Sequence, residues 1–209
     1  MPDFSIELSA REQGYSVVCG VDEAGRGPLC GSVVAAACVL PHDVDLPQLN
    51  DSKKLTPKKR DLLFDQICEK ALAYGIAEAT VEEINELNIL EATLLAMRRA
   101  IESLHTPDGE VVVADFALID GNIDRDFPVP AKAVVKGDAI SMSISAASIL
   151  AKVTRDRMCL DMDAAYPQYG IAKHKGYGTK EHMNALRVHG PSPIHRTKFI
   201  RFLDEERHE

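Results

Sequence analysis

The chain has 209 residues, 45% of them hydrophobic, so it can bury one well-packed domain with a small appendage but not two full-sized domains. No apolar run approaches the roughly 20 residues of a membrane span, and the N-terminus lacks a signal-peptide layout, which predicts a cytosolic protein with no membrane partner. The five cysteines form no C-x-x-C pair and are interpreted as buried reduced thiols. The formal net charge of −8, taken alone, argues against a nucleic-acid partner.

The distribution of charge reverses that interpretation. Residues 132–201 contain seven Lys and five Arg against five acids, a net charge of +7 that leaves −15 for the rest of the chain. Attraction to phosphates depends on the local field, so a basic third of an acidic protein can form a one-sided footprint for a polyanion. Ordinary solvated helix faces are the alternative explanation.

The first half of the chain predicts strands that alternate with helices. Residues 15–21 and 31–40 have strand patterns and are joined across a short Gly/Pro loop, and residues 75–80 predict a third strand. Thr56 before Pro57 predicts a capped helix start. A capping box predicts a longer helix over residues 80–104.

The second half continues this alternation and then becomes helical. Residues 111–119 and 131–135 predict strands, and residues 141–165, 179–190 and 194–207 predict helices. The fold class is therefore α/β, with a mixed central sheet flanked by helices and a helical C-terminal portion. Ligands of such sheets gather where strands deliver their carboxyl ends.

Residues 20–28 (GVDEAGRGP) carry the most specific local pattern. Asp22 and Glu23 end an apolar strand, and a loop of Gly25, Arg26 and Gly27 follows at once. Carboxylates that bind a hard cation, beside an Arg and glycine amides that can hold a phosphate, indicate metal-assisted phosphoryl chemistry. Strand alternation sends Asp22 and Glu23 to opposite faces, so a bulge or the strand end must intervene if both serve one site.

Two further acids, Asp120 and Asp138, lie just past predicted strands. Each stands beside a glycine and, taken singly, is more common as a turn or helix-initiating residue than as a ligand. If neighbouring strands bring all four acids together, like charges raise the pKa of some members, and two divalent cations would remove that cost. Mg²⁺ or Mn²⁺ suits all-oxygen ligands, whereas zinc is disfavoured because no H-E-x-x-H motif or cysteine pair is present.

Five motifs in this order resemble the type 2 ribonucleases H, most closely bacterial ribonuclease HII. They are residues 20–28 (GVDEAGRGP), 50–55 (NDSKKL), 119–121 (IDG), 136–138 with 145–156 (KGD, SAASILAKVTRD), and 175–179 (KGYGT). The resemblance covers about residues 16–202 and implies a ribonuclease H-like fold. It is interpreted as a single catalytic domain over residues 1–209, with a core at about 15–165 and a helical extension at about 166–209 that completes the substrate cleft.

The resemblance also implies roles for individual residues. The catalytic acids that hold two divalent metal ions, Mn²⁺ or Mg²⁺, would be Asp22, Glu23, Asp120 and Asp138. The junction where a ribonucleotide is followed by DNA would be recognised by Gly25, Arg26, Gly27 and Tyr177. Only the 2′-OH separates RNA from DNA at one nucleotide, and an aromatic ring can sense a sugar that lacks it.

Several assignments keep an alternative. Tyr177 also fits a half-buried tyrosine in a glycine loop, and Lys53 fits either a phosphate contact or a solvated turn. Candidates for neutralising a phosphate backbone, each equally compatible with an ordinary surface charge, are Lys152, Arg155, Lys173, Lys175 and Arg196. Two histidines among them, His174 and His195, are either structural or phosphate-facing.

The activity that the resemblance implies is endonucleolytic. It is hydrolysis of the phosphodiester 5′ of a ribonucleotide in RNA/DNA hybrids and at RNA-DNA junctions, including single ribonucleotides misincorporated in DNA, leaving 3′-OH and 5′-phosphate ends. Two alternatives are a catalytically silent hybrid-binding module, disfavoured by the four acids, and a small-substrate phosphatase, which would leave the basic third without a task.

The related classes fit less well. About 15 residues precede the first predicted strand, which disfavours ribonuclease HIII with its extra N-terminal domain. The adjacency of Asp22 and Glu23 excludes the type 1 arrangement of acids. We expect a monomer, and contact with a sliding clamp is undecided because no clamp-binding box is present.

Overall fold

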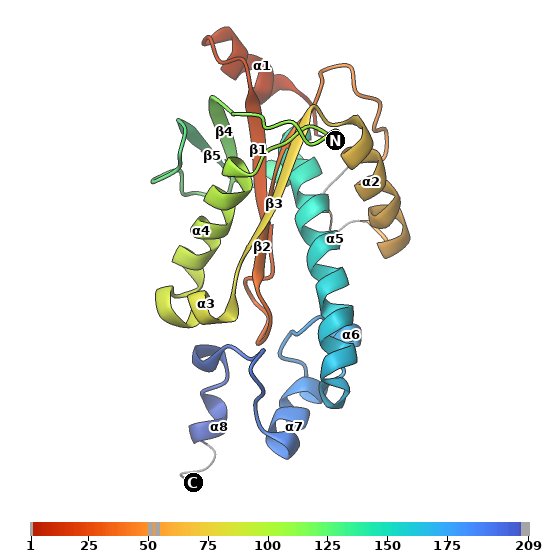
Figure 1. The fold of residues 1–209 in the computed structure, drawn as a ribbon, viewed down its shortest axis with the longest axis vertical. Coiled ribbons are helices and arrows are strands. Elements are labelled where there is room, and N and C mark those ends of the chain that lie inside the picture. The colour runs from red at the N-terminus through yellow and green to blue at the C-terminus, as the bar shows by residue number, and fades with distance from the viewer. Residues whose placement is uncertain (1, 50–51, 53–54, 206–209) are drawn as a thin grey trace.

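A five-stranded mixed sheet forms the centre of the molecule in a computed structural model that describes residues 2–49, 52 and 55–205 (Figure 1). Its strands are β1 (Val18–Ala24), β2 (Val33–Val39), β3 (Ala73–Ala79), β4 (Phe116–Asp120) and β5 (Ala131–Val134), in the order β3-β2-β1-β4-β5. The first three strands pair antiparallel, whereas β4 runs parallel to β1 and β5 runs parallel to β4. The predicted α/β class with a mixed sheet is confirmed.

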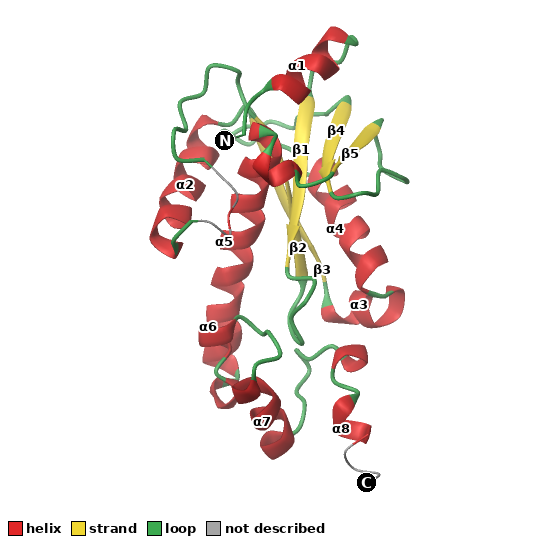
Figure 2. Ribbon diagram, turned by 180° about the vertical axis from the view of Figure 1, so that it is seen from behind, coloured by secondary structure: helices red, strands yellow, loops and turns green. Residues whose placement is uncertain are grey.

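Helices cover both faces of this sheet. The longer ones are α1 (Ser5–Glu12), α2 (Pro57–Lys70), α3 (Val81–Leu87), α4 (Ile89–Glu102), α5 (Met142–Ala165) and α7 (Lys180–His189), and the one-turn helices are α6 (Ile171–His174) and α8 (Phe202–Glu205). The sheet lies between α4 and α5, and the C-terminal elements α6 to α8 extend beyond one end of it (Figure 2). None of the described helices is long and apolar enough to cross a bilayer.

Side-chain alternation along β1 divides the core between the two helices. Cys19 and Val21 pack in the cluster that contains the apolar face of α4. Gly20 points the other way, where a Cβ would collide with the backbone of Ser143 and Ile144. The glycine therefore lets the first turn of α5 lie directly against β1, close to the acids that follow.

The N-terminal ends of the helices carry the caps that their sequences predict. Thr56 Oγ1 accepts the amide of Lys59, and Thr80 and Glu83 form the reciprocal capping box. The start of α5 has a further partner from α1, because the buried carboxylate of Glu7 accepts both the Ser141 hydroxyl (2.6 Å) and the Ser143 amide (2.9 Å). This long-range cap fixes the helix that packs beneath β1.

Four expectations about elements were wrong or incomplete. The helix expected over 80–104 is two helices, because Asn88 has a φ of 82° and caps α4 with its own side chain. The strand expected over 111–119 is confined to β4, and the helix expected over 194–207 is a 3₁₀ turn at Thr197–Phe199 followed by the short α8. Helix α1 was not anticipated, since its apolar residues are few.

Candidate active site

Three of the four predicted acids meet at the carboxyl ends of β1, β4 and β5. Val21 pairs with Ile119 in parallel register, so Asp22 and Asp120 lie side by side at the same level of the sheet. Asp138 lies in a 3₁₀ turn just after β5, and the amide of Gly137 in that turn donates to Asp120 Oδ1 at 2.7 Å. The strand ends therefore bring together acids that are 98 and 18 residues apart in the chain, as the sequence predicted.

Glu23 reaches the same region through the end of the sheet rather than through a bulge. The pairing of Gly20–Ala24 with β2 runs without interruption, so Glu23 begins on the face opposite to Asp22. Because β4 ends at Asp120, none of the described strands flanks Glu23 on that side. Both acids line one cavity, and both lie within β1 rather than just past it.

Charge repulsion makes this cluster unfavourable in the absence of a cation. Asp22 and Asp138 are only 6% and 7% exposed. Burial, and next the charges of Glu23, Asp120 and Asp138, raise the pKa of Asp22 well above its usual range. Burial also raises the pKa of Glu23, although Arg26 opposes this from 3.5 Å.

The donor set fits hard divalent cations. All four side chains offer carboxylate oxygens, and bound cations would offset the repulsion between their negative charges. Among the described residues, these acids do not form a set of ligand atoms all within 4.8 Å of one another. A centre shared by two cations spans a wider ligand set than a single-ion centre does.

A cavity of about 360 Å³ joins the acids to the glycine-rich loop. It is lined by Asp22, Glu23, Ala24, Gly25, Arg26, Gly27, Ser52, Ser148, Lys152, Arg155 and Tyr177. Asp22, Glu23, the glycine-rich loop and Tyr177 therefore line the same cavity. Asp120 and Asp138 are not on its lining, although they lie beside Asp22 at the sheet edge.

Buried Arg196 holds the glycine-rich loop in place. Its guanidinium donates to the carbonyls of Gly25 (2.7 Å), Arg26 (3.0 Å), Pro28 (2.8 Å) and Gly31 (2.8 Å). These bonds turn the loop carbonyls toward the interior. Arg196 is fully buried, and burial lowers its pKa to about 10, so the interpretation of this residue as a phosphate contact was wrong.

Gly25 is required where it stands. Its φ of 103° is a conformation that side-chain-bearing residues rarely adopt, and a Cβ would collide with the side chain of Arg155. Arg155 is itself buried and donates to the carbonyls of Cys30 (3.3 Å) and Lys175 (3.1 Å). It therefore connects the loop to the segment that carries Tyr177.

Tyr177 lies over Gly27. Its side chain is half exposed, and its ring approaches to 3.3 Å of the position that a Cβ on Gly27 would occupy. The two segments are joined by a bond from the Leu29 amide to the Gly176 carbonyl at 2.8 Å. The structure thus places side by side the two motifs to which the family resemblance assigns recognition of the RNA-DNA junction.

Two other lysines predicted as phosphate contacts form ion pairs within the protein, and a third lies outside the described residues. Lys53 is outside the described residues. Lys152 lines the cavity and pairs with Asp156 at 2.7 Å, whereas Lys173 pairs with Glu181 at the surface. Sequence reasoning missed Ser52 and Ser148 as lining residues; their hydroxyls lie 2.8 Å apart, and both belong to motifs that carried the resemblance.

Comparison with known proteins decides the family. The family model described as Ribonuclease HII matches residues 19–202. The chain belongs to the ribonuclease HII family. It is 55% identical over 200 residues to a ribonuclease HII of Desulfitobacterium hafniense, with 93% of this chain and 75% of that protein covered.

Solved structures agree with this membership. The crystal structure of ribonuclease H2 from Pyrococcus horikoshii OT3 aligns with a TM-score of 0.74 and 27% identity, covering 93% of this chain and all of that one. The structure of Bst-RNase HIII in complex with Mn²⁺ shares the fold at 19% identity and a TM-score of 0.59, covering 94% of this chain and 67% of that one. The chain is therefore a ribonuclease H, a nuclease of the hydrolase class that acts on nucleic acid, and its family is metal-dependent.

Proposed function

We propose that the chain hydrolyses the phosphodiester on the 5′ side of a ribonucleotide, in RNA/DNA hybrids and at RNA-DNA junctions, and leaves 3′-OH and 5′-phosphate ends. Single ribonucleotides misincorporated in duplex DNA are included among its substrates. Such an activity would begin the removal of these ribonucleotides after DNA replication. The cytosolic location and the monomeric state stay predictions.

One observation carries this proposal: Tyr177 and the Gly25–Gly27 loop share a cavity with Asp22 and Glu23. A ribose seated between the ring and the loop would have its phosphate next to the acids. The 2′-OH both donates and accepts hydrogen bonds, and glycine backbone can approach it closely. A phosphatase for small esters would gain nothing from an aromatic ring beside its catalytic acids.

Individual side chains then have distinct tasks. Asp22, Glu23, Asp120 and Asp138 would hold two divalent ions, Mn²⁺ or Mg²⁺, which when bound supply a nucleophilic water and neutralise charge on the reacting phosphate. Gly25, Arg26 and Gly27 would orient the ribonucleotide, with the half-exposed Arg26 beside Glu23 facing a phosphate. Tyr177 would stack on the sugar of the following nucleotide and favour one that lacks a hydroxyl.

The test is Asp120→Asn in a cleavage assay on a DNA duplex with one embedded ribonucleotide. Removing one carboxylate from the cluster should lower the cleavage rate by at least about 10²- to 10³-fold, while binding of the duplex persists. Products mapped at nucleotide resolution with Mg²⁺ and with Mn²⁺ check the cleavage position. Undiminished turnover would remove Asp120 from the site.

Asp124→Asn is the matched control, because it makes the same change in charge four residues later on an exposed side chain. Its cleavage rate should equal that of the wild type. Cleavage on the 3′ side of the ribonucleotide, or efficient hydrolysis of a small phosphate ester with no cleavage of the duplex, would contradict the proposed function.

A further inference from the structure

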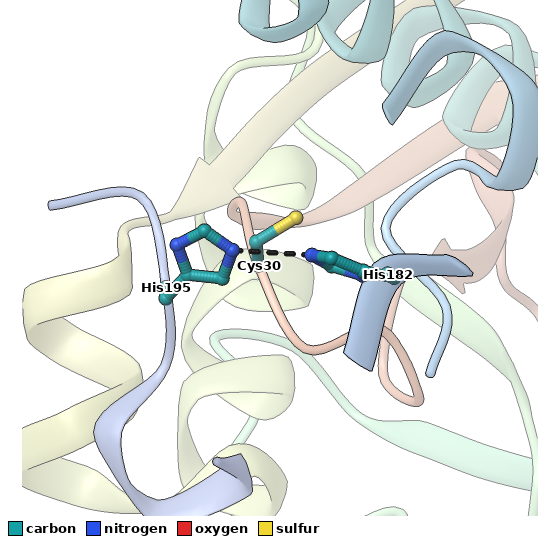
Figure 3. Close-up of side chains that lie close together, drawn as sticks. All are labelled: Cys30, His182 and His195. Carbon is teal, nitrogen blue, oxygen red and sulfur yellow. Dashed lines mark hydrogen bonds between the residues drawn. The ribbon is translucent and has the colours of Figure 1, made fainter. Parts of the chain in front are cut away.

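Three side chains next to the Tyr177 segment form a buried cluster that the proposed function does not use. Cys30, His182 and His195 place their potential ligand atoms within 4.8 Å of one another, and all three are buried (Figure 3). The two imidazoles face each other, with their Nε2 atoms 3.1 Å apart. His182 comes from α7, whereas His195 comes from the irregular segment that also supplies Arg196.

The hydrogen-bond partners fix which nitrogen of each ring carries a proton. The backbone amide of Ser192 can only donate, and it lies 3.1 Å from His195 Nδ1, so that nitrogen accepts. The proton of neutral His195 is therefore on Nε2, from which it is donated to His182 Nε2. His182 in turn carries its proton on Nδ1 and donates it to the Tyr177 carbonyl at 3.1 Å.

These bonds form a chain of uniform direction: Ser192 amide to His195, His195 to His182, and His182 to the carbonyl of Tyr177. Each link satisfies a buried polar atom, and a charged form of either ring would set two N–H groups against each other. Burial, and next the proximity of His182, lowers the pKa of His195 to about 4, and burial also lowers the pKa of His182. Both rings are therefore neutral at pH 7.

The same bonds argue against a metal ion at the cluster. A cation would need both Nε2 atoms without hydrogen, yet the Ser192 amide already occupies the Nδ1 lone pair of His195. It would also need a thiolate, whereas burial raises the pKa of Cys30 to about 12. The series of hydrogen bonds satisfies the ring nitrogens of both histidines without either change.

We propose that His182 and His195 are positioning residues for Tyr177, and that the pair sets how strongly the enzyme distinguishes an RNA-DNA junction from a uniform RNA/DNA hybrid. This inference rests on the proposed role of Tyr177. This series of hydrogen bonds ends on the Tyr177 carbonyl and helps to hold the ring of Tyr177 over Gly27. Without the His182 bond, the Tyr177 carbonyl keeps the Thr179 amide as its donor at 2.8 Å, so the ring is held less firmly over the loop but is not released. The acids on the sheet stay where they are.

The proton positions can be measured directly in the wild-type protein by NMR of ¹⁵N-labelled histidine side chains at pH 7. We expect neutral His195 with its proton on Nε2 and neutral His182 with its proton on Nδ1. A charged ring, the opposite tautomers, or metal-shifted Nε2 signals from both rings would overturn the inference. This measurement needs no variant and no substrate.

The functional test compares kcat/KM for a duplex with one ribonucleotide to kcat/KM for a uniform RNA/DNA hybrid. Loss of one positioning hydrogen bond in His195→Leu should lower the junction-to-hybrid ratio about 5- to 10-fold. His195→Gln, whose amide nitrogen can replace Nε2 as the donor, should keep the ratio. In a Tyr177→Ala background, His195→Leu should have no further effect, because both changes act through one ring.

His189→Leu is the matched control, since it makes the same replacement on the exposed end of α7. It should leave the ratio unchanged. If His195→Leu lowers both rates equally, or lowers the ratio further without Tyr177, the positioning role is wrong while the proposed function stands. A wild-type protein that fails to cleave the junction substrate overturns both.

Discussion

The acids at the sheet edge and the two recognition loops are built in opposite ways. Three of the acids lie at the ends of regular strands and Asp138 lies in the turn after β5, and burial and mutual repulsion raise the pKa of Asp22 and of Glu23. The loops have irregular backbone, yet their carbonyls are satisfied by two buried arginines, Arg155 and Arg196. The acids are held rigidly by the sheet but destabilised by their charges. The loops are stabilised by the hydrogen bonds that their carbonyls accept from the two arginines.

This difference matches the different tasks proposed for the acids and for the loops. A cluster of carboxylates is stabilised only when cations bind. The repulsion that the cations relieve therefore strengthens the binding of metal, and through it of substrate. A loop that must discriminate one hydroxyl group needs a fixed shape before substrate arrives. Substitutions in the two regions should therefore change the free energy of unfolding in opposite directions. It should fall strongly for substitutions in the loops and rise for a substitution among the acids.

The largest expected effect is at Arg196. Arg196→Met leaves four loop carbonyls without their donor and should lower the free energy of unfolding by about 3–5 kcal/mol. Urea unfolding measures this loss. Arg201→Met, on an exposed side chain five residues later, should stay within about 0.5 kcal/mol of the wild type. Equal stability of the two variants would break the comparison, since Arg196 would then not support the loop.

A smaller loss is expected at Gly25. Gly25→Ala imposes an unfavourable φ and displaces Arg155, and it should lower the free energy of unfolding by about 2–4 kcal/mol. Gly14 has nearly the same φ, 101°, but nothing within 4 Å of its added Cβ. Gly14→Ala should therefore lose only about 1 kcal/mol, from backbone strain alone. The difference between the two variants measures the packing of the loop on Arg155.

The smallest expected effect has the opposite sign. Asp22→Asn should raise the unfolding free energy of the metal-free protein by about 1–2 kcal/mol, because it removes a buried charge from the cluster. Cleavage should be lost in the same variant. Asp108→Asn, on an exposed loop, is the control that should change neither property.

The pH dependence of this gain follows from the direction of the pKa shift. The pKa of Asp22 is raised in the folded state above its ordinary value of 3.8, so the folded protein binds a proton that the unfolded chain releases. The cost of the charge is fully present above the folded pKa and fades as the pH falls toward 3.8. The stability difference between wild type and Asp22→Asn should shrink over the same range. A difference that is constant with pH would mean that the charge is not its cause.

Much of the sheet could be predicted from local patterns. Apolar runs, two of them ending in an acid beside a glycine, predicted a strand at each of the five places, although β4 is shorter than expected. Threonine caps predicted the starts of α2, α3 and α7. Errors occurred where a single residue or weak periodicity decided the outcome. Asn88 divides one expected helix through its positive φ. The segment that begins at Ile194 is not helical at its start, because its backbone is hydrogen-bonded to Leu29 and Gly31.

The sequence by itself located the four candidate acids, because Asp22, Glu23, Asp120 and Asp138 each stand at or just past an apolar run with a strand pattern. The order of the strands, which brings these acids together, was decided by the tertiary structure. Tertiary structure decided the roles of Arg196 and His195. The sequence alone is compatible with Arg196 as either a phosphate contact or an ordinary charge, and with His195 as either structural or phosphate-facing. Arg196 contacts the carbonyl of Gly25 across 171 positions of the chain, and His195 contacts His182 across 13. Local patterns cannot specify such contacts, since burial and the direction of each hydrogen bond exist only after the distant segments have packed together.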